Sequence, residues 1–272
     1  MLFLISMCKI MRLFTKDELI LELRKISERG GIESTRTGND GSVGNMLEDI
    51  LGIEENNLPI PNTNEWEIKT QRLNVSTLTT LFHNEPSPRA IKFVPKILLP
   101  HYGWKHQEAN KKHTASERSF RQTIHGNSPS DRGFMVKIDR ISKKVLVSFD
   151  SAKVTATHRV WLQEVANNVG LSELNPQPYW GFDDLASVAR TKLLNCFYVQ
   201  AKVKRENGKE YYHYCKVMML QNFNFDGFLR EIENGNILVD FDARTGHNHG
   251  TKFRMRQNCL PLLYEKVTRI VE

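Results

Sequence analysis

The first regular pattern of apolar positions follows a capping signal near the N-terminus. Thr15 precedes Glu18 by three residues, which is the spacing of a capping box. Apolar side chains then recur at helical intervals, at Leu19, Leu23 and Ile26, until Gly30 and Gly31 interrupt them. We therefore predict an amphipathic helix after Thr15, and a shorter helix around residues 47–51 that ends at Gly52.

Alternating and β-branched runs predict strands over most of the remaining chain. One strand is centred on residues 66–70, and a β-branched run follows at 76–82. Residues 134–139 and 144–149 alternate like paired strands, and residues 197–204 and 211–219 flank a turn at Asn207 and Gly208. Helices are expected at 183–194 and 225–233, with a further strand at 237–242, so the chain is expected to be an α/β protein.

Residues 125–133 (HGNSPSDRG) have the composition of a linker. We place a lobe boundary there, with residues 11–128 in one lobe and 129–272 in the other. The chain of 272 residues is long enough for two lobes. The second lobe is the richer in strand patterns.

Charge and cysteine content narrow the range of partners and compartments. Lys and Arg outnumber Asp and Glu by 38 to 31, which suits a polyanionic partner. The four cysteines are widely spaced, so we expect neither a zinc site nor a disulfide framework, and a cytoplasmic location. The apolar leader MLFLISMCKIM lacks the features of a signal peptide, and translation from Met7 or Met11 would explain it. We expect no membrane-spanning segment.

The sharpest local motif is Glu-x-Lys in EWEIK. Glu67 and Lys69 lie two apart on a predicted strand and therefore point to one face. A carboxylate can hold Mg²⁺ against a phosphodiester, while the ammonium orients the attacking water and offsets developing negative charge. Glu48, on the preceding helix, could add a carboxylate or orient the lysine. The alternative is a solvated strand face, on which Glu and Lys two residues apart are commonplace.

The basic segment RTGHNHGTKFRMR, residues 244–256, carries the second candidate site. On a strand, His247 and His249 would face one side, with Arg254 close behind and Arg244 just before. Such donors can address guanine N7 and O6 in the major groove of DNA. A zinc site is a poor alternative because further ligands are missing, whereas a basic surface loop remains the plain alternative.

The order of several motifs resembles the MvaI/BcnI family of type II restriction endonucleases, and more distantly the MutH mismatch-repair nuclease. The similarity covers the chain from about Arg36 onward. It is carried by GNDGSVGNMLEDIL, NNLPIPN, EWEIKTQR, LTTLF, FRQTIHGN, YWGFDDL, IENGNILVDFD and HNHGTKFR.

The resemblance implies a PD-(D/E)XK nuclease core, with a central mixed sheet flanked by helices, and a strand-rich DNA-recognition lobe. Glu67 would bind the metal, Lys69 would be the catalytic lysine, and Glu48 the helix-borne acid. The family has a metal-binding Asp five residues before Glu67, where this chain has Asn62. Base recognition carries over to His247, His249, Arg254 and, less directly, Arg244.

The expected activity is Mg²⁺-dependent hydrolysis of double-stranded DNA at a short, G·C-containing, nearly palindromic site. The resemblance also implies a monomer, and a cognate DNA methyltransferase is a possible partner. Two alternatives stay open. One is a MutH-like nicking enzyme of repair, and the other is a sequence-specific DNA-binding protein that is catalytically silent because of Asn62.

Overall fold

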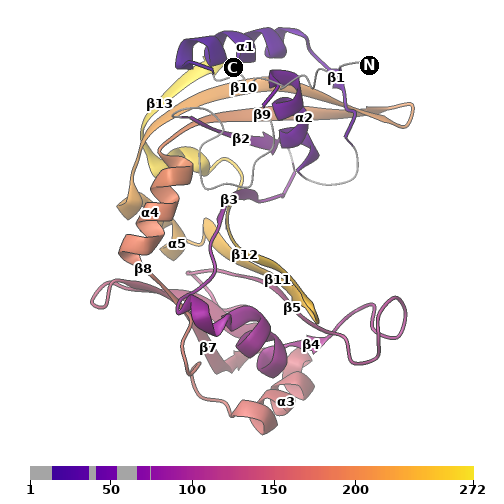
Figure 1. The fold of residues 1–272 in the computed structure, drawn as a ribbon, viewed down its shortest axis with the longest axis vertical. Coiled ribbons are helices and arrows are strands. Elements are labelled where there is room, and N and C mark those ends of the chain that lie inside the picture. Colours follow the sequence, from indigo (N-terminus) through magenta and orange to yellow (C-terminus); the bar gives the residue numbers. More distant parts are fainter. Residues whose placement is uncertain (1–13, 37–40, 54–65, 74) are drawn as a thin grey trace, which may run out of the picture. The chain divides into compact units, whose positions relative to one another are not determined.

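The computed structural model describes residues 14–36, 41–53, 66–73 and 75–272. Its contacts divide the chain into two compact units, and each unit is assembled from separate parts of the sequence (Figure 1). Unit 1 comprises residues 1–77, 194–222 and 266–272, and unit 2 comprises 78–193 and 223–265.

Unit 1 is built on a mixed sheet in the order β1–β10–β9–β2, with β13 paired to β10. Its strands are β1 (Ile32–Glu33), β2 (Glu67–Arg72), β9 (Asn195–Glu206), β10 (Lys209–Phe223) and β13 (Tyr264–Val271). The end strand β2 runs parallel to β9, whereas β9 and β10 form an antiparallel hairpin. Asn207 and Gly208 both have positive φ in the turn of this hairpin, as the predicted Asn-Gly turn requires.

Two helices of unit 1 pack on one face of this sheet. The predicted capping box is present at the start of α1 (Lys16–Glu28), and α2 (Ser42–Leu51) ends at Gly52, which has φ 69°. Their buried side chains form a single core with alternate residues of the sheet, among them Ile68, Phe197 and Val199. Glu67 and Lys69 alternate with Ile68 and therefore project from the opposite face.

Unit 2 contains two antiparallel sheets. The larger has the order β3–β12–β11–β5–β4, and the smaller has the order β6–β7–β8. The strands are β3 (Thr79–His83), β4 (Trp104–Lys105), β5 (Arg118–Ile124), β6 (Arg132–Asp139), β7 (Lys144–Val154), β8 (Tyr179–Gly181), β11 (Ile237–Arg244) and β12 (His247–Met255). The helices are the π-helical η2 (Val94–Tyr102), α3 (Arg159–Val169), α4 (Phe182–Leu193) and α5 (Phe225–Glu233), with short 3-10 turns at Arg89–Ile91, Ala156–His158 and Leu260–Leu263.

The division into units differs from the predicted boundary at residues 128/129. Residues 125–131 connect β5 to β6 inside unit 2, and residues 132 and 133 already belong to β6. Phe120 before this segment and Phe134 after it lie in edge-to-face contact, with ring centroids 5.5 Å apart. The Val136 amide also donates to the His125 carbonyl at 2.9 Å. The Gly, Ser and Pro residues of this segment therefore form a packed turn.

Helix α3 (Arg159–Val169) is a further difference, because it was not predicted from the sequence.

Candidate functional site

Glu67 and Lys69 form an ion pair on the face of β2 that is opposite the helices. The Lys69 Nζ lies 2.7 Å from the Glu67 Oε1, and the two side chains are 13% and 8% exposed, respectively. Partial burial lowers the local dielectric, so this carboxylate and ammonium interact more strongly than a solvated pair. A second Glu–Lys pair with the same spacing, Lys204 and Glu206 on β9, is exposed to solvent at 71% and 53%. Burial distinguishes the predicted catalytic pair from this ordinary surface pair.

Glu48 lies on the side of α2 that packs against β2. A Cβ atom at Gly44 would come within 2.7 Å of the Thr70 Oγ1, so a larger residue would displace the Thr70 side chain or the helix. Glu48 is one helical turn after Gly44 and shares its face. Glu48 thus approaches β2 from the helix-covered face of the sheet, whereas Glu67 and Lys69 project from the other. β2 is the end strand, so its edge is where these carboxylates can converge.

A buried polar network fastens the first turn of α2 to the end of β2. Arg72 donates through Nη2 to the Ser42 Oγ at 2.7 Å and to the Tyr212 hydroxyl at 3.2 Å. Tyr212 donates to Glu210, and Arg72 and Glu210 form an ion pair at 3.4 Å. Because Ser42 opens the helix that carries Glu48, this network fixes the helix against the strand that carries Glu67. No local sequence pattern predicts this network, since its members are up to 170 residues apart.

The carboxyl group of this network is held in its charged form. Burial raises the pKa of Glu210, but the hydrogen bonds from Tyr212 and Arg205 and the positive charge of Arg72 lower it by more, so its net pKa is below the ordinary value. The negative charge of Glu210 is therefore balanced by the arginines that it pairs with in unit 1, Arg72 and Arg205.

Three further polar side chains line the face of Glu67 and Lys69. In the parallel pairing of β2 with β9, Tyr198 is the partner of Lys69. The buried Tyr198 hydroxyl donates to the Gln71 Oε1 and accepts from the Gln200 Nε2 at 3.1 Å. Gln71 also donates to the Thr77 carbonyl at 3.2 Å. The Tyr198 hydroxyl is thus bonded to Gln71, while the Lys69 ammonium is bonded to Glu67. The neutral amides of Gln71 and Gln200 line the site beside this ion pair.

The predicted metal-binding positions fall only partly within the described residues. Asn62, and the neighbouring Glu65, lie outside them. Within the described ranges, no group of three or more His, Cys, Asp and Glu side chains forms a ready-made metal cluster. Of the two predicted metal ligands, Glu67 lies within the described residues. Its carboxylate oxygens are hard ligands, which Mg²⁺ prefers.

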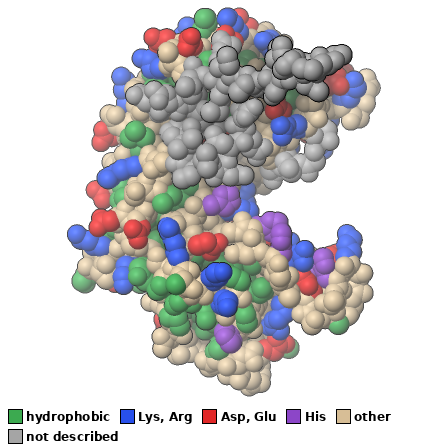
Figure 2. Space-filling model, viewed as in Figure 1, with side chains coloured by type: hydrophobic (Ala, Val, Ile, Leu, Met, Phe, Trp, Pro, Cys, Tyr) green, Lys and Arg blue, Asp and Glu red, His purple; other side chains and the backbone are tan. Residues whose placement is uncertain are grey.

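The predicted base-reading residues lie in the β11–β12 hairpin of unit 2. Thr251 pairs with Phe241 but Asn248 pairs with Ala243, so one extra residue is accommodated in β12 as a bulge. Simple alternation would put His247 and Arg254 on opposite faces, and the bulge returns His247 to the face of Arg254. The His247 and His249 rings lie edge to face, with centroids 4.2 Å apart. In Figure 2 histidine side chains lie over this hairpin, near cationic and acidic side chains.

Both predicted arginines are held by carboxylates of the same unit. Arg254 Nη1 lies 3.3 Å from the Asp240 Oδ2, and its Nη2 donates to the Leu78 carbonyl at 3.1 Å. Arg244 Nη1 lies 2.9 Å from the Glu117 Oε1. These bonds fix the direction of each guanidinium before any ligand is present.

The family model of the MvaI/BcnI restriction endonuclease family matches residues 20–264. The chain belongs to this family. The match includes both the β11–β12 hairpin and the site at Glu67 and Lys69, called here the β2 site. The resemblance deduced from separate motifs is therefore confirmed over nearly the whole chain.

Solved structures agree with this membership. A structure described as a complex of restriction endonuclease MvaI with its cognate DNA substrate has a TM-score of 0.74 and 27% identity, and the match covers 95% of this chain and 100% of that chain. A structure of MvaI in the absence of DNA has a TM-score of 0.52 and 26% identity, with 96% of this chain and 100% of that chain covered. No curated protein sequence matches the chain. The predicted α/β fold of the PD-(D/E)XK kind is thereby confirmed.

The described helices include none that is long and apolar enough to cross a membrane.

Proposed function

We propose that this protein is a Mg²⁺-dependent, sequence-specific endonuclease that hydrolyses duplex DNA in the manner of a type II restriction enzyme. The observation that carries the proposal is the largely buried Glu67–Lys69 pair on the end strand of a restriction-endonuclease fold. MvaI, its structural relative, was solved with cognate DNA.

Each residue of the β2 site has a distinct part in this proposal. Glu67 would hold Mg²⁺, with help from Glu48 and from Asn62, whose side-chain carbonyl can still coordinate. The bound ion would polarise the scissile phosphate and make a bound water easier to deprotonate. Lys69 would orient the attacking water and offset the charge that grows on the phosphate oxygens. Glu67 in turn holds the Lys69 ammonium in place at 2.7 Å.

Recognition is assigned to the β11–β12 hairpin. His247 and His249 are exposed at its tip, while Arg254 and Arg244 are held by carboxylates, and together they offer donors to base edges. From the family we expect a short, G·C-containing, nearly palindromic target that is cut by a monomer to leave a 5′-phosphate and a 3′-hydroxyl. A cognate DNA methyltransferase would protect the host sequence.

The direct test is incubation of the purified chain with Mg²⁺ and plasmid DNA of known sequence. Discrete fragments whose ends map to one short sequence would support the proposal. Nicked circles alone, or cleavage that requires added protein factors, would favour a MutH-like nicking enzyme instead. The Glu67→Gln variant is the control for a contaminating nuclease, because it keeps the shape of the side chain and removes its charge.

Asn62 is the observation that favours a second function. An amide in place of a carboxylate removes one negative charge from the metal site, which weakens the hold on a divalent cation. On this alternative the chain would bind a specific DNA sequence without cutting it. Sequence-selective binding with no cleavage in either Mg²⁺ or Mn²⁺ would support it.

A further inference from the structure

The polar face of the larger sheet in unit 2 continues beyond the β11–β12 hairpin onto β5. Residues that pair directly on antiparallel strands lie on the same face. His247 pairs with Arg244, and Arg244 pairs in turn with Ser119 of β5. On the next row of this face, Asp242 pairs with Arg121. One uninterrupted polar face therefore joins the predicted base-reading strand to β5.

Arg121 is held on this face as the predicted base-reading arginines are. Its Nε lies 2.7 Å from the Asp242 Oδ1, while the side chain remains 56% exposed. The Asp242 Oδ2 lies 3.7 Å from Lys252 on β12, so this carboxylate links β5 to the reading strand. The Nε of Arg121 makes the close approach to Asp242, and a guanidinium has four further N–H groups with which to contact a ligand.

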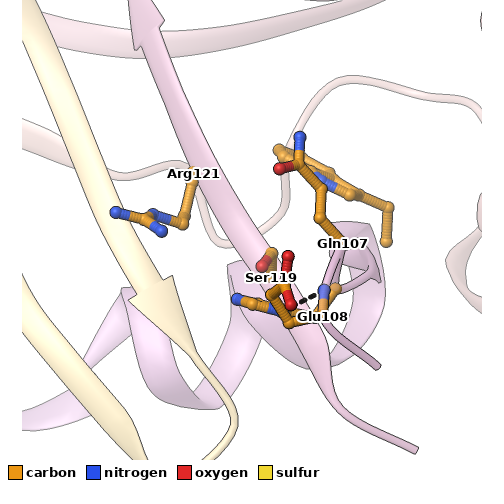
Figure 3. Close-up of a pocket in the computed structure, with 6 residues that line it drawn as sticks. Gln107, Glu108, Ser119 and Arg121 are labelled. Carbon is orange, nitrogen blue, oxygen red and sulfur yellow. Dashed lines mark hydrogen bonds between the residues drawn. The ribbon is translucent and has the colours of Figure 1, made fainter. Parts of the chain in front are cut away.

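A pocket of about 300 Å³ opens beside Arg121. It is lined by Trp104, His106, Gln107, Glu108, Ser119 and Arg121. Gln107 and Glu108 follow β4 and lie on the other side of β5 from the guanidinium of Arg121 (Figure 3). The Glu108 amide donates to the His106 Nδ1 at 3.0 Å, which fixes the turn that carries both side chains.

The chemistry of this pocket distinguishes between the two parts of DNA that an arginine can contact. A phosphate offers only acceptors and a negative charge, so the nearby carboxylates of Glu108 and Asp242 would repel it. A base edge offers both donors and acceptors. Arginine, glutamine and carboxylate side chains are the groups that pair with guanine, adenine and cytosine edges. This mixed set of donors and acceptors therefore suits a base edge.

We propose that Arg121, with Gln107 and Glu108, forms a second base-reading site. This site would contact a base pair that flanks the DNA sequence recognised by β12. This inference rests on the proposed function, since it extends the DNA surface of that function. β5 is two strands from β12, or about 10 Å at the usual strand spacing. This span equals about three base-pair steps of duplex DNA, so one bound duplex is long enough to reach both sites.

The test is selection of bound duplexes from a random library by the full chain, in Ca²⁺ so that binding is measured without cleavage. Wild type, Arg121→Ala, Arg121→Lys and Gln107→Ala are compared by sequencing the enriched DNA. Arg140→Ala is the matched control, because Arg140 is 54% exposed and pairs with Glu233 at 2.8 Å on the same unit. Arg121 is exposed, so its removal leaves the core of unit 2 intact.

We expect wild type to prefer one base at a flanking position by at least about fivefold, the lower end for a good bidentate contact. Arg121→Ala and Arg121→Lys should lose that preference while the central site stays selected, and Gln107→Ala should weaken it. Arg140→Ala should match wild type. A flat flanking profile in wild type, or an unchanged profile in Arg121→Ala, would overturn the proposal. A full flanking preference in Arg121→Lys would show that the bidentate guanidinium is not the group that reads the base, and would overturn it equally.

The same preparations are assayed for plasmid cleavage in Mg²⁺, which separates this inference from the proposed function. Flanking preference in binding without any cleavage would overturn the nuclease and leave the second reading site standing. Cleavage at a central sequence, with no base preference at the flanking positions, would support the nuclease and overturn the second base-reading site.

Discussion

Lys69 and Glu67 share one face of β2 and form an ion pair of 2.7 Å, with 13% and 8% of their side chains exposed. The exposed Lys204–Glu206 pair on the neighbouring strand β9 has the same spacing and a distance of 2.9 Å. The two pairs differ chiefly in burial and in their neighbours, so they offer a matched comparison between a proposed catalytic pair and a surface pair.

Replacing Lys69 with Ala should lower the single-turnover rate of DNA cleavage by at least ~100-fold, because the ammonium that orients water and offsets charge is lost. Affinity for the same duplex in Ca²⁺ should stay within about threefold, since Lys69 is not a reader of bases. Lys204→Ala is the control and should cleave as wild type does. Near-normal cleavage by Lys69→Ala would remove Lys69 from the catalytic site.

Restoring a carboxylate at position 62 should strengthen metal binding. The Asn62→Asp variant should reach half-maximal cleavage at a lower Mg²⁺ concentration than wild type, because a charged oxygen ligand holds the cation more tightly than an amide oxygen. Rates are measured across a Mg²⁺ titration at fixed ionic strength. An unchanged or higher requirement for Mg²⁺ would indicate that other ligands complete the site.

Arg254→Ala should reduce binding to the mapped target by about 1 to 3 kcal/mol and should hardly change binding to random duplex. The guanidinium is already aimed by Asp240 and by the Leu78 carbonyl, so the loss concerns a preorganised group. Competition binding at fixed salt, in Ca²⁺, measures both affinities, with Arg140→Ala as the control. Equal losses on both duplexes would make the hairpin a basic surface without sequence selectivity.

Glu210→Gln should destabilise unit 1 by about 3 kcal/mol at pH 7, because Arg72 would keep its buried charge without the counter-charge. The pKa of Glu210 is lowered in the folded chain, so its charged form contributes fully above the unfolded pKa of about 4.3. That contribution is lost as the pH falls through the lower folded-state pKa.

Urea unfolding of Glu210→Gln and wild type at pH 7 and pH 3 measures this difference in the free energy of unfolding. The difference should shrink at pH 3, whereas Glu206→Gln, at the exposed surface pair, should change little at either pH. A difference of the same size at both values would show that the charge of Glu210 is not the cause.

The local elements of this protein were determined by the sequence itself. The capping box at Thr15 and Glu18 begins α1, and Gly52 ends α2, because both signals act through hydrogen bonds and φ angles within a few residues. The turn at Asn207 and Gly208 sets the β9–β10 hairpin for the same reason. The shared face of Glu67 and Lys69 followed from strand alternation alone.

Only the tertiary structure decided how these elements combine. Side chains far apart in sequence meet through strand pairing and packing, which no local pattern encodes, as when Arg72 joins Ser42 to Tyr212 and Glu210. The division into units likewise follows contacts between distant segments, so a turn with linker composition lies inside unit 2. The bulge in β12 reverses the alternation that the sequence implies and returns His247 to the face of Arg254. Spacing along the chain set the candidate residues, and the physics of long-range pairing and burial decided which of them share a surface.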